Sequence, residues 1–104
     1  HVDDLAAAHI RSLDYLRTGG QSQMFNCGYG KGYSVREVIA AMKRVSGIDF
    51  NVVESPRRSG DTIAIYADSA RVREVLDWRP RFEDLDLICR TSFEWERELI
   101  SKSV

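Results

Sequence analysis

The chain has 104 residues, which is enough for one small domain but short for an enzyme that carries its own cofactor fold. Its 15 Lys and Arg residues nearly balance 16 Asp and Glu residues, so no global charge attracts nucleic acid or an anionic membrane. Hydrophobic residues make up 43% of the chain, too many for a disordered protein, and no apolar run approaches the roughly 20 residues of a membrane span. We therefore expect a folded cytoplasmic protein that binds neither nucleic acid nor membranes.

The first half of the chain predicts a helix, a strand and a second helix. Apolar residues recur at helical spacing over 4–17, with Asp3 or Asp4 as the cap and Gly19-Gly20 as the end. Residues 24–27 predict a short strand that leads into a glycine-rich loop at 28–32. Ser34 and Glu37 then form a capping-box pattern, which predicts a helix ending near Gly47.

The second half continues with short strands and two further helices. Residues 50–54 predict a second strand, so that 24–54 would be a strand–helix–strand unit with parallel strands. A polar loop at 55–62 precedes a third strand at 63–67. Asp68 or Ser69 caps a short helix that closes at Trp78-Arg79-Pro80, and a last helix spans 83–101. The predicted class is α/β, rich in helix, with a few short and partly parallel strands.

The two cysteines, Cys27 and Cys89, are far apart, and neither has the spacing of a zinc site or a redox pair. We expect both to be buried thiols in a reducing compartment, and we expect no metal site. The abrupt opening at His1, directly before a helix, favours a piece of a longer protein, although a processed or trimmed terminus would look the same.

The glycine-rich loop invites comparison with a dinucleotide fingerprint, because it follows a predicted strand and opens a helix. The glycines are Gly28, Gly30 and Gly32, and the position that should hold the third fingerprint glycine is Tyr33. This departure favours a tight turn followed by a capped helix over a dinucleotide site.

The polar loop contains the sequence Arg57-Arg58-Ser59-Gly60-Asp61. Guanidinium groups suit bidentate contact with phosphate oxygens, and Asp61 can accept a hydrogen bond from a sugar hydroxyl, which together indicate a nucleotide. The same pattern equally fits a surface loop whose arginines pair with nearby carboxylates. The residues alone leave both interpretations open.

No catalytic set is visible in the sequence. No tyrosine is followed four residues later by a lysine, and no Ser-His-Asp or Cys-His arrangement has a suggestive spacing. We therefore assign no catalytic residue to this chain.

Five stretches together resemble the UDP-glucose 4-epimerase family, a branch of the extended short-chain dehydrogenases. They are the opening nonapeptide from His1 to His9, the segment from Phe25 to Val35, and the Arg57–Asp61 loop with Tyr66-Ala67-Asp68 and Leu76–Pro80 after it. The resemblance covers nearly the whole chain, in order, and it is to the C-terminal part of such enzymes. It implies that residues 1–104 are the substrate-binding part of an extended short-chain dehydrogenase fold and that the 24–54 unit joins a Rossmann sheet outside this chain.

The activity that the resemblance implies is that of an isomerase of galactose metabolism, acting on UDP-glucose and UDP-galactose. Tightly held NAD would take hydride from C4, the keto sugar would turn over, and hydride would return to the opposite face. The NAD site and the catalytic Tyr-x-x-x-Lys would lie in the N-terminal part, so we expect no residue of this chain to bind NAD. The whole enzyme would be a homodimer.

By the same resemblance, Arg58 would contact the pyrophosphate and Asp61 the ribose, while Ile65 would form a pocket wall at a position that varies in bulk. A side chain smaller than tyrosine there leaves room for N-acetylated sugars. The chain alone should be inactive and should self-associate through apolar surface left uncovered. Alternatives are a related nucleotide-sugar epimerase or dehydratase acting on UDP-uronates or UDP-pentoses, and a non-enzymatic nucleotide-binding module.

Overall fold

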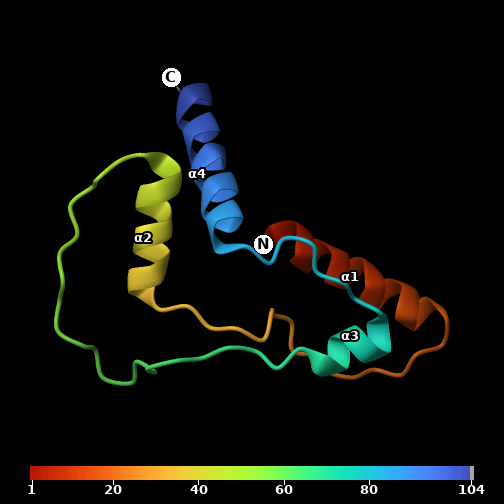
Figure 1. Ribbon diagram of the computed structural model, residues 1–104. Coiled ribbons are helices and arrows are strands. Elements are labelled where there is room, and N and C mark those ends of the chain that lie inside the picture. The colour runs from red at the N-terminus through yellow and green to blue at the C-terminus, as the bar shows by residue number, and fades with distance from the viewer. Residues whose placement is uncertain (104) are drawn as a thin grey trace. The chain divides into compact units, whose positions relative to one another are not determined.

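A computed structural model describes residues 1–103, and four helices account for its regular structure. They are α1 (Val2–Arg17), α2 (Val35–Ser46), α3 (Ala70–Leu76) and α4 (Leu85–Lys102) (Figure 1). The chain divides into two compact units: unit 1 comprises 1–32 and 66–83, and unit 2 comprises 33–65 and 84–104. Each unit is therefore built from two separate stretches of sequence. None of the described helices is long and apolar enough to cross a membrane.

The helix boundaries follow from local capping chemistry. The capping box of α2 is confirmed: the Ser34 hydroxyl accepts from the Glu37 amide at 3.2 Å, and the Glu37 carboxylate accepts from the Ser34 amide at 2.7 Å. Gly47 ends α2 in the left-handed conformation, at φ 69°, which favours glycine. The predicted cap of α1 was wrong, because His1 caps that helix, through its ring Nδ1, and Asp4 is buried instead.

The three predicted strands do not form among the described residues. Segments 24–27, 50–54 and 63–67 lie outside helices and have no strand pairing, as the absence of arrows over 1–103 in Figure 1 illustrates. A β-strand exists only when a neighbouring backbone supplies its hydrogen bonds. The short, partly parallel strands predicted for the α/β class are therefore not confirmed among residues 1–103, where the regular structure is helical.

The core of unit 1 lies between α1 and α3. It contains Ala8, Val72, Leu76 and Trp78, each at most 7% exposed. The indole Nε1 of Trp78 donates to the backbone carbonyl of Asp4 at 2.9 Å, which ties the residues after α3 to the first turn of α1. Partly buried aromatic side chains, including Phe25 and Tyr29, pack around this core.

Unit 2 is held together by packing of α2 against α4. Ala41 of α2 and Cys89 of α4 are buried, with exposed fractions of 0% and 4%. At the surface, the guanidinium of Arg44 holds the carboxylate of Asp86 in two contacts of 2.6 and 3.3 Å. These hydrogen bonds hold the pKa of Asp86 below its usual value.

Candidate functional site

The Arg58–Asp61 segment is a tight turn in unit 2. The Asp61 amide donates to the Arg58 carbonyl at 3.3 Å, and Gly60 has φ 89°, a conformation that favours glycine. This turn brings its first and last side chains together, so the Arg58 Nε lies 3.3 Å from an Asp61 carboxylate oxygen. Both side chains are accessible, and Arg58 is 86% exposed.

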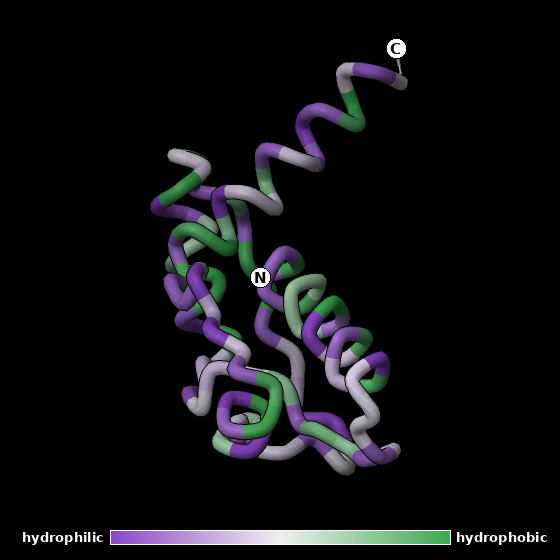
Figure 2. Tube along the Cα trace, turned by 90° about the vertical axis from the view of Figure 1, so that its right-hand side faces the viewer, coloured by the Kyte–Doolittle hydropathy of each residue, from purple (hydrophilic) through white to green (hydrophobic). Residues whose placement is uncertain are grey.

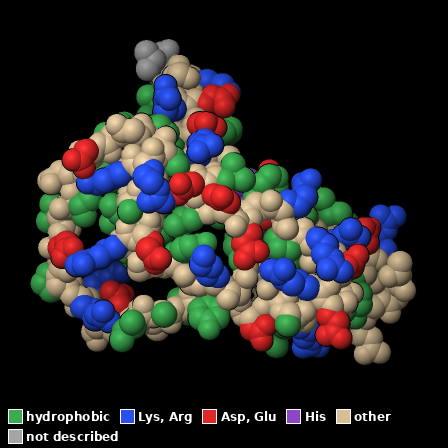
Figure 3. Space-filling view, viewed as in Figure 1, with side chains coloured by type: hydrophobic (Ala, Val, Ile, Leu, Met, Phe, Trp, Pro, Cys, Tyr) green, Lys and Arg blue, Asp and Glu red, His purple; other side chains and the backbone are tan. Residues whose placement is uncertain are grey.

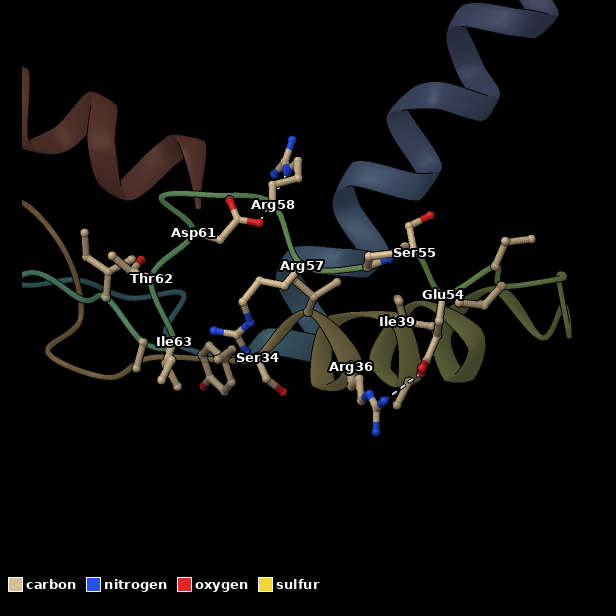
Figure 4. A pocket seen from close by; sticks show the side chains of 18 of the residues that line it. Ser34, Arg36, Ile39, Glu54, Ser55, Arg57, Arg58, Asp61, Thr62 and Ile63 are labelled. Carbon is tan, nitrogen blue, oxygen red and sulfur yellow. Dashed lines mark hydrogen bonds and ion pairs between the residues drawn. The ribbon is translucent and has the colours of Figure 1, made fainter.

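The turn borders a cleft of about 1050 Å³ between α2 and the loop that follows it (Figure 4). Six charged side chains line the cleft: Arg36, Lys43, Glu54, Arg57, Arg58 and Asp61. Apolar residues of α2 and of the loop line the rest, among them Ile39, Val53 and Ile65. The cleft thus combines an apolar surface with an excess of positive charge, as sites for anionic organic ligands do.

The structure places all three sequence-predicted residues, Arg58, Asp61 and Ile65, along this one cleft. Ile65 is 80% exposed, so its side chain is not packed in a core and can contact a ligand in the cleft. Figure 4 shows the Arg57 side chain turned toward Ser34 at the start of α2, whereas Arg58 points away from that helix. The side chains of these two adjacent arginines therefore extend to different sides of the loop.

The cations of the cleft differ in how they are paired. Arg36 lies 2.8 Å from Glu54, and Lys43 pairs with Asp49, whose pKa it holds below the usual value. Among the described residues, Arg57 has no carboxylate partner within ion-pair distance. Arg57 is thus the cation of this cleft that is available to an incoming anion without breaking an existing pair.

Sequence reasoning missed Arg36 and Lys43, which reach the cleft from α2. Their spacing of seven residues, with Ile39 and Ala40 between them, places them on one side of the helix. The seven-residue spacing could have pointed to these two residues in the sequence. It indicates a site only when the loop after α2 is known to face this side of the helix.

The glycine-rich loop does not offer a dinucleotide site. A Cβ at Gly28 would lie 2.8 Å from the Ala67 Cβ, so this glycine serves close packing within unit 1. At the start of α2, where a pyrophosphate would need free amides, the Ser34 hydroxyl and the Glu37 carboxylate already occupy the capping positions. The glycine-rich loop and the start of α2 therefore do not fit the pyrophosphate of a dinucleotide.

A second polar cluster, in unit 1, is structural. The carboxylate of Asp4, 3% exposed, accepts from the Tyr29 hydroxyl and the Arg81 amide at 2.8 Å and from the Phe82 amide at 3.0 Å. Burial and the hydrogen bond to Asp4 raise the pKa of Tyr29, so this tyrosine is poorly suited to act as a base.

The expectation for the cysteines was half right. Cys89 is buried in unit 2, as predicted, but Cys27 is exposed. On the face shown in Figure 3, acidic and basic side chains are interspersed over both units rather than gathered into one basic area.

Comparison with known proteins gives these features a family context. No protein-family profile matches the chain. A UDP-glucose 4-epimerase of Azospirillum brasilense is 46% identical over 99 residues, which span 95% of this chain and 28% of that protein. The chain is similar to the C-terminal portion of UDP-glucose 4-epimerases. It spans about 30% of the length of the epimerases it matches.

Two solved epimerase structures share this fold. The UDP-Glc/GlcNAc 4-epimerase of Campylobacter jejuni has a TM-score of 0.85 at 49% identity, over 94% of this chain and 30% of that one. The UDP-glucose 4-epimerase of Stenotrophomonas maltophila, solved with NAD and formylated UDP-arabinopyranose, has a TM-score of 0.90 at 36% identity, over 100% of this chain and 30% of that one.

Proposed function

We propose that this chain is the UDP-sugar-binding portion of an NAD-dependent UDP-hexose 4-epimerase and that the unit 2 cleft holds the nucleotide diphosphate. The observation that carries the proposal is the Arg58–Asp61 turn, which presents a guanidinium and a carboxylate side by side at the cleft. The similarity to UDP-glucose 4-epimerases over 95% of the chain supports the same ligand class.

In this proposal Arg58 contacts the pyrophosphate and Asp61 accepts a hydrogen bond from a ribose hydroxyl. Because the two side chains now pair with each other, a bound nucleotide must replace that contact, so phosphate takes the place of Asp61 on the guanidinium. The pair is exposed and contributes at most about 1 kcal/mol, so opening it costs little. UDP-glucose and UDP-galactose are the proposed ligands.

NAD and the proton-transferring tyrosine would be supplied by the remaining portion of the enzyme, since the glycine-rich loop does not fit the cofactor. When bound there, NAD would carry the hydride between the two faces of the sugar. The role of this chain is to bind and orient the nucleotide end of the substrate. Added NAD should therefore produce no turnover of UDP-galactose by this chain alone, and measurable turnover would contradict the proposal.

The binding proposal is tested by adding UDP and NAD separately to the labelled chain and following its amide resonances. We expect UDP to shift resonances within 54–65 and to bind more tightly than NAD. Arg58→Ala should weaken UDP binding roughly tenfold to a hundredfold, as loss of charge-assisted hydrogen bonds does. Arg11→Ala, at an exposed arginine of α1, is the control and should bind UDP normally. Equal affinity for NAD, shifts centred on 28–32, or no binding at all would contradict the proposed site.

We propose further that Ile65 leaves room for an N-acetyl group on the sugar. The C. jejuni relative is described as a UDP-Glc/GlcNAc 4-epimerase, which is consistent with this proposal. Ile65→Tyr should weaken binding of UDP-GlcNAc more than binding of UDP-glucose, measured by calorimetry. Equal effects on the two ligands would remove Ile65 from sugar selection.

We also propose that residues 24–27 and 50–54 gain strand partners in a sheet formed by the longer protein. Neither segment has strand pairing here. Residues 24–27 precede α2 in the sequence, and residues 50–54 follow it. Amides of the two segments should exchange rapidly with solvent in this chain alone and slow down when an N-terminal epimerase portion is added. Unchanged exchange would argue against that role.

A related activity on UDP-pentoses is the second candidate. The S. maltophila relative was solved with a formylated UDP-arabinopyranose, a pentose derivative. Titrating UDP-glucose and a UDP-pentose separately into the chain distinguishes a UDP-hexose from a UDP-pentose substrate. Both ligands make the same contacts through UDP, so the one with the preferred sugar should bind more tightly.

A further inference from the structure

The cationic side chains of the unit 2 cleft differ in the electric field that each projects into the solvent. All but Arg57 are paired with a carboxylate of the same unit: Arg36–Glu54, Lys43–Asp49 and Arg58–Asp61. The field of such a pair falls off faster with distance than that of a single charge, because the two opposite charges nearly cancel. Among the described residues, Arg57 has no such partner. At a distance, the cleft therefore has the charge of Arg57.

The rest of the chain does not supply a general attraction for anions. Its formal net charge is -1, and hydrophilic residues are spread along the whole trace in Figure 2 rather than gathered in one segment. The walls of the cleft include the apolar side chains of Ile39, Val53 and Ile65, which are less polarisable than water and concentrate the field of a nearby charge. An anionic ligand is therefore attracted to this cleft by a local charge and not by the chain as a whole.

The Arg57 side chain extends to a different side of the loop from the contact proposed for the pyrophosphate. Figure 4 shows Arg57 turned toward Ser34, whereas Arg58 points away from α2. With the pyrophosphate and the ribose held by Arg58 and Asp61, Arg57 is close to the ligand without contacting it. A cation in this position speeds the encounter with an anion but contributes little to holding it.

We propose that Arg57 is a steering residue: its charge attracts a nucleoside diphosphate sugar to the unit 2 cleft and speeds binding, before the ligand displaces Asp61 from Arg58. The inference rests on the proposed function, since it takes the Arg58–Asp61 turn as the place of the pyrophosphate. Asp61 neutralises Arg58 until the ligand arrives, whereas Arg57 is unpaired from the start. Arg57 thus sets the rate of association, and Arg58 sets how long the ligand stays.

The size of the effect follows from Coulomb's law. UDP-glucose carries two negative charges, one on each phosphate. At roughly 10 Å from Arg57, their attraction corresponds to roughly threefold faster association in about 0.01 M salt and to less than about twofold in about 0.15 M salt. Arg57→Glu replaces this attraction with a repulsion of the same size, so the change becomes roughly fivefold to tenfold at the lower salt concentration.

The test is a titration of the full chain with UDP-glucose, in which the line shapes of amide resonances give the association and dissociation rate constants. Circular dichroism verifies that each variant is folded. At the lower salt concentration, Arg57→Ala should slow association roughly threefold and Arg57→Glu roughly fivefold to tenfold, both with unchanged dissociation. At the higher salt concentration both effects should fall to about twofold or less.

Two variants separate steering from direct contact and from net charge. Arg57→Lys should associate like the unmodified chain, since steering requires the charge and not the planar fork of the guanidinium. Arg11→Glu, at an exposed arginine of unit 1, makes the same change in net charge as Arg57→Glu and should slow association by less than about twofold. Faster dissociation of Arg57→Ala, slow association of Arg57→Lys, or equal rates for Arg57→Glu and Arg11→Glu would each overturn the steering role.

Arg58→Ala distinguishes failure of this inference from failure of the proposed function. It should speed dissociation roughly tenfold to a hundredfold, whether or not Arg57 steers the ligand. If Arg58→Ala behaves in this way and Arg57→Glu associates normally, only the steering role is wrong. If UDP-glucose does not bind the unmodified chain, or Arg58→Ala leaves dissociation unchanged, the proposed site is wrong and the steering role with it.

Discussion

Replacing Asp4 with asparagine tests whether the buried carboxylate holds unit 1 together. The substitution preserves shape but converts one carboxylate oxygen into an amide donor. In the better orientation the new amide nitrogen faces the Arg81 amide, and the remaining oxygen keeps Tyr29 and Phe82. One buried N–H loses its acceptor, at about 1–3 kcal/mol, and two charge-assisted hydrogen bonds become neutral ones, so we expect a loss of about 2–4 kcal/mol.

Tryptophan fluorescence during urea unfolding measures this loss in unit 1 specifically. Trp78 is 2% exposed in the core of unit 1, whereas Trp95 lies in unit 2 and is 56% exposed. A Trp95→Phe background therefore leaves Trp78 as the reporter. The expected loss lowers the unfolding midpoint by roughly 1–2 M urea.

Asp14→Asn is the control for Asp4→Asn, since Asp14 is an exposed aspartate on the same helix. It makes the same change in charge and should alter stability by less than about 0.5 kcal/mol. If Asp4→Asn and Asp14→Asn unfold at the same urea concentration, the account of Asp4 as the buried tie of unit 1 is wrong.

The same carboxylate predicts how unit 1 responds to acid. Burial pushes the pKa of Asp4 upward, but hydrogen bonds from the Arg81 amide, the Tyr29 hydroxyl and the Phe82 amide together outweigh it, and the pKa lies below its ordinary value. The charged form thus favours the folded state. Its stabilising contribution is complete above the unfolded value of about 4 and is lost as pH falls through the lower, folded value. Asp4→Asn should remove this part of the acid dependence, whereas an acid profile unchanged by the substitution would contradict it.

Three further substitutions probe local features, each followed by chemical unfolding. Ser34→Ala should cost about 1 kcal/mol by removing the cap of α2, and Ser34→Asp should retain most of that stability. Val72→Ala should cost about 2 kcal/mol through a cavity, against less than about 1 kcal/mol for Val75→Ala, because the two valines are 1% and 39% exposed. Gly28→Ala should destabilise unit 1 by about 1–3 kcal/mol through collision with Ala67, and Ala67→Gly in the same chain should recover part of it. The role of the cap is contradicted if Ser34→Ala leaves the stability unchanged. The packing of Val72 is contradicted if Val72→Ala and Val75→Ala cost the same, and the contact between Gly28 and Ala67 is contradicted if Ala67→Gly recovers no stability in the Gly28→Ala chain.

The helices were predictable because their signals are local. The Ser34–Glu37 capping box and the glycine at 47 lie within one turn of the helix ends they define, and the structure confirms both. The apolar periodicity of α1 and α4 likewise needs no knowledge of the rest of the fold.

The strands and the role of Asp4 were not predictable in the same way. Residues 24–27 and 50–54 have strand-like composition, but strand formation depends on a second backbone that local sequence does not reveal. Asp4 has the sequence signature of a helix cap, and its burial depends on amides at residues 81 and 82, far along the chain. At the candidate site, the Arg58–Asp61 turn was visible in the sequence, whereas the contribution of α2 to the cleft depended on tertiary structure.

The hydrogen bonds that Asp4 accepts from the amides of residues 81 and 82 also determine when unit 1 can fold during synthesis. Its carboxylate is separated from the amide donors of residues 81 and 82 by 77 and 78 positions, and the intervening stretch 33–65 belongs to unit 2. Closing a loop of that length costs about 4 kcal/mol of chain entropy. While the ribosome is still adding residues before Phe82, α1 can form as a helix but its carboxylate has no final partners. Unit 1 therefore completes only after Phe82 has been made, so the carboxylate of Asp4 reaches its native contacts only after the 78 residues that follow it have been synthesised.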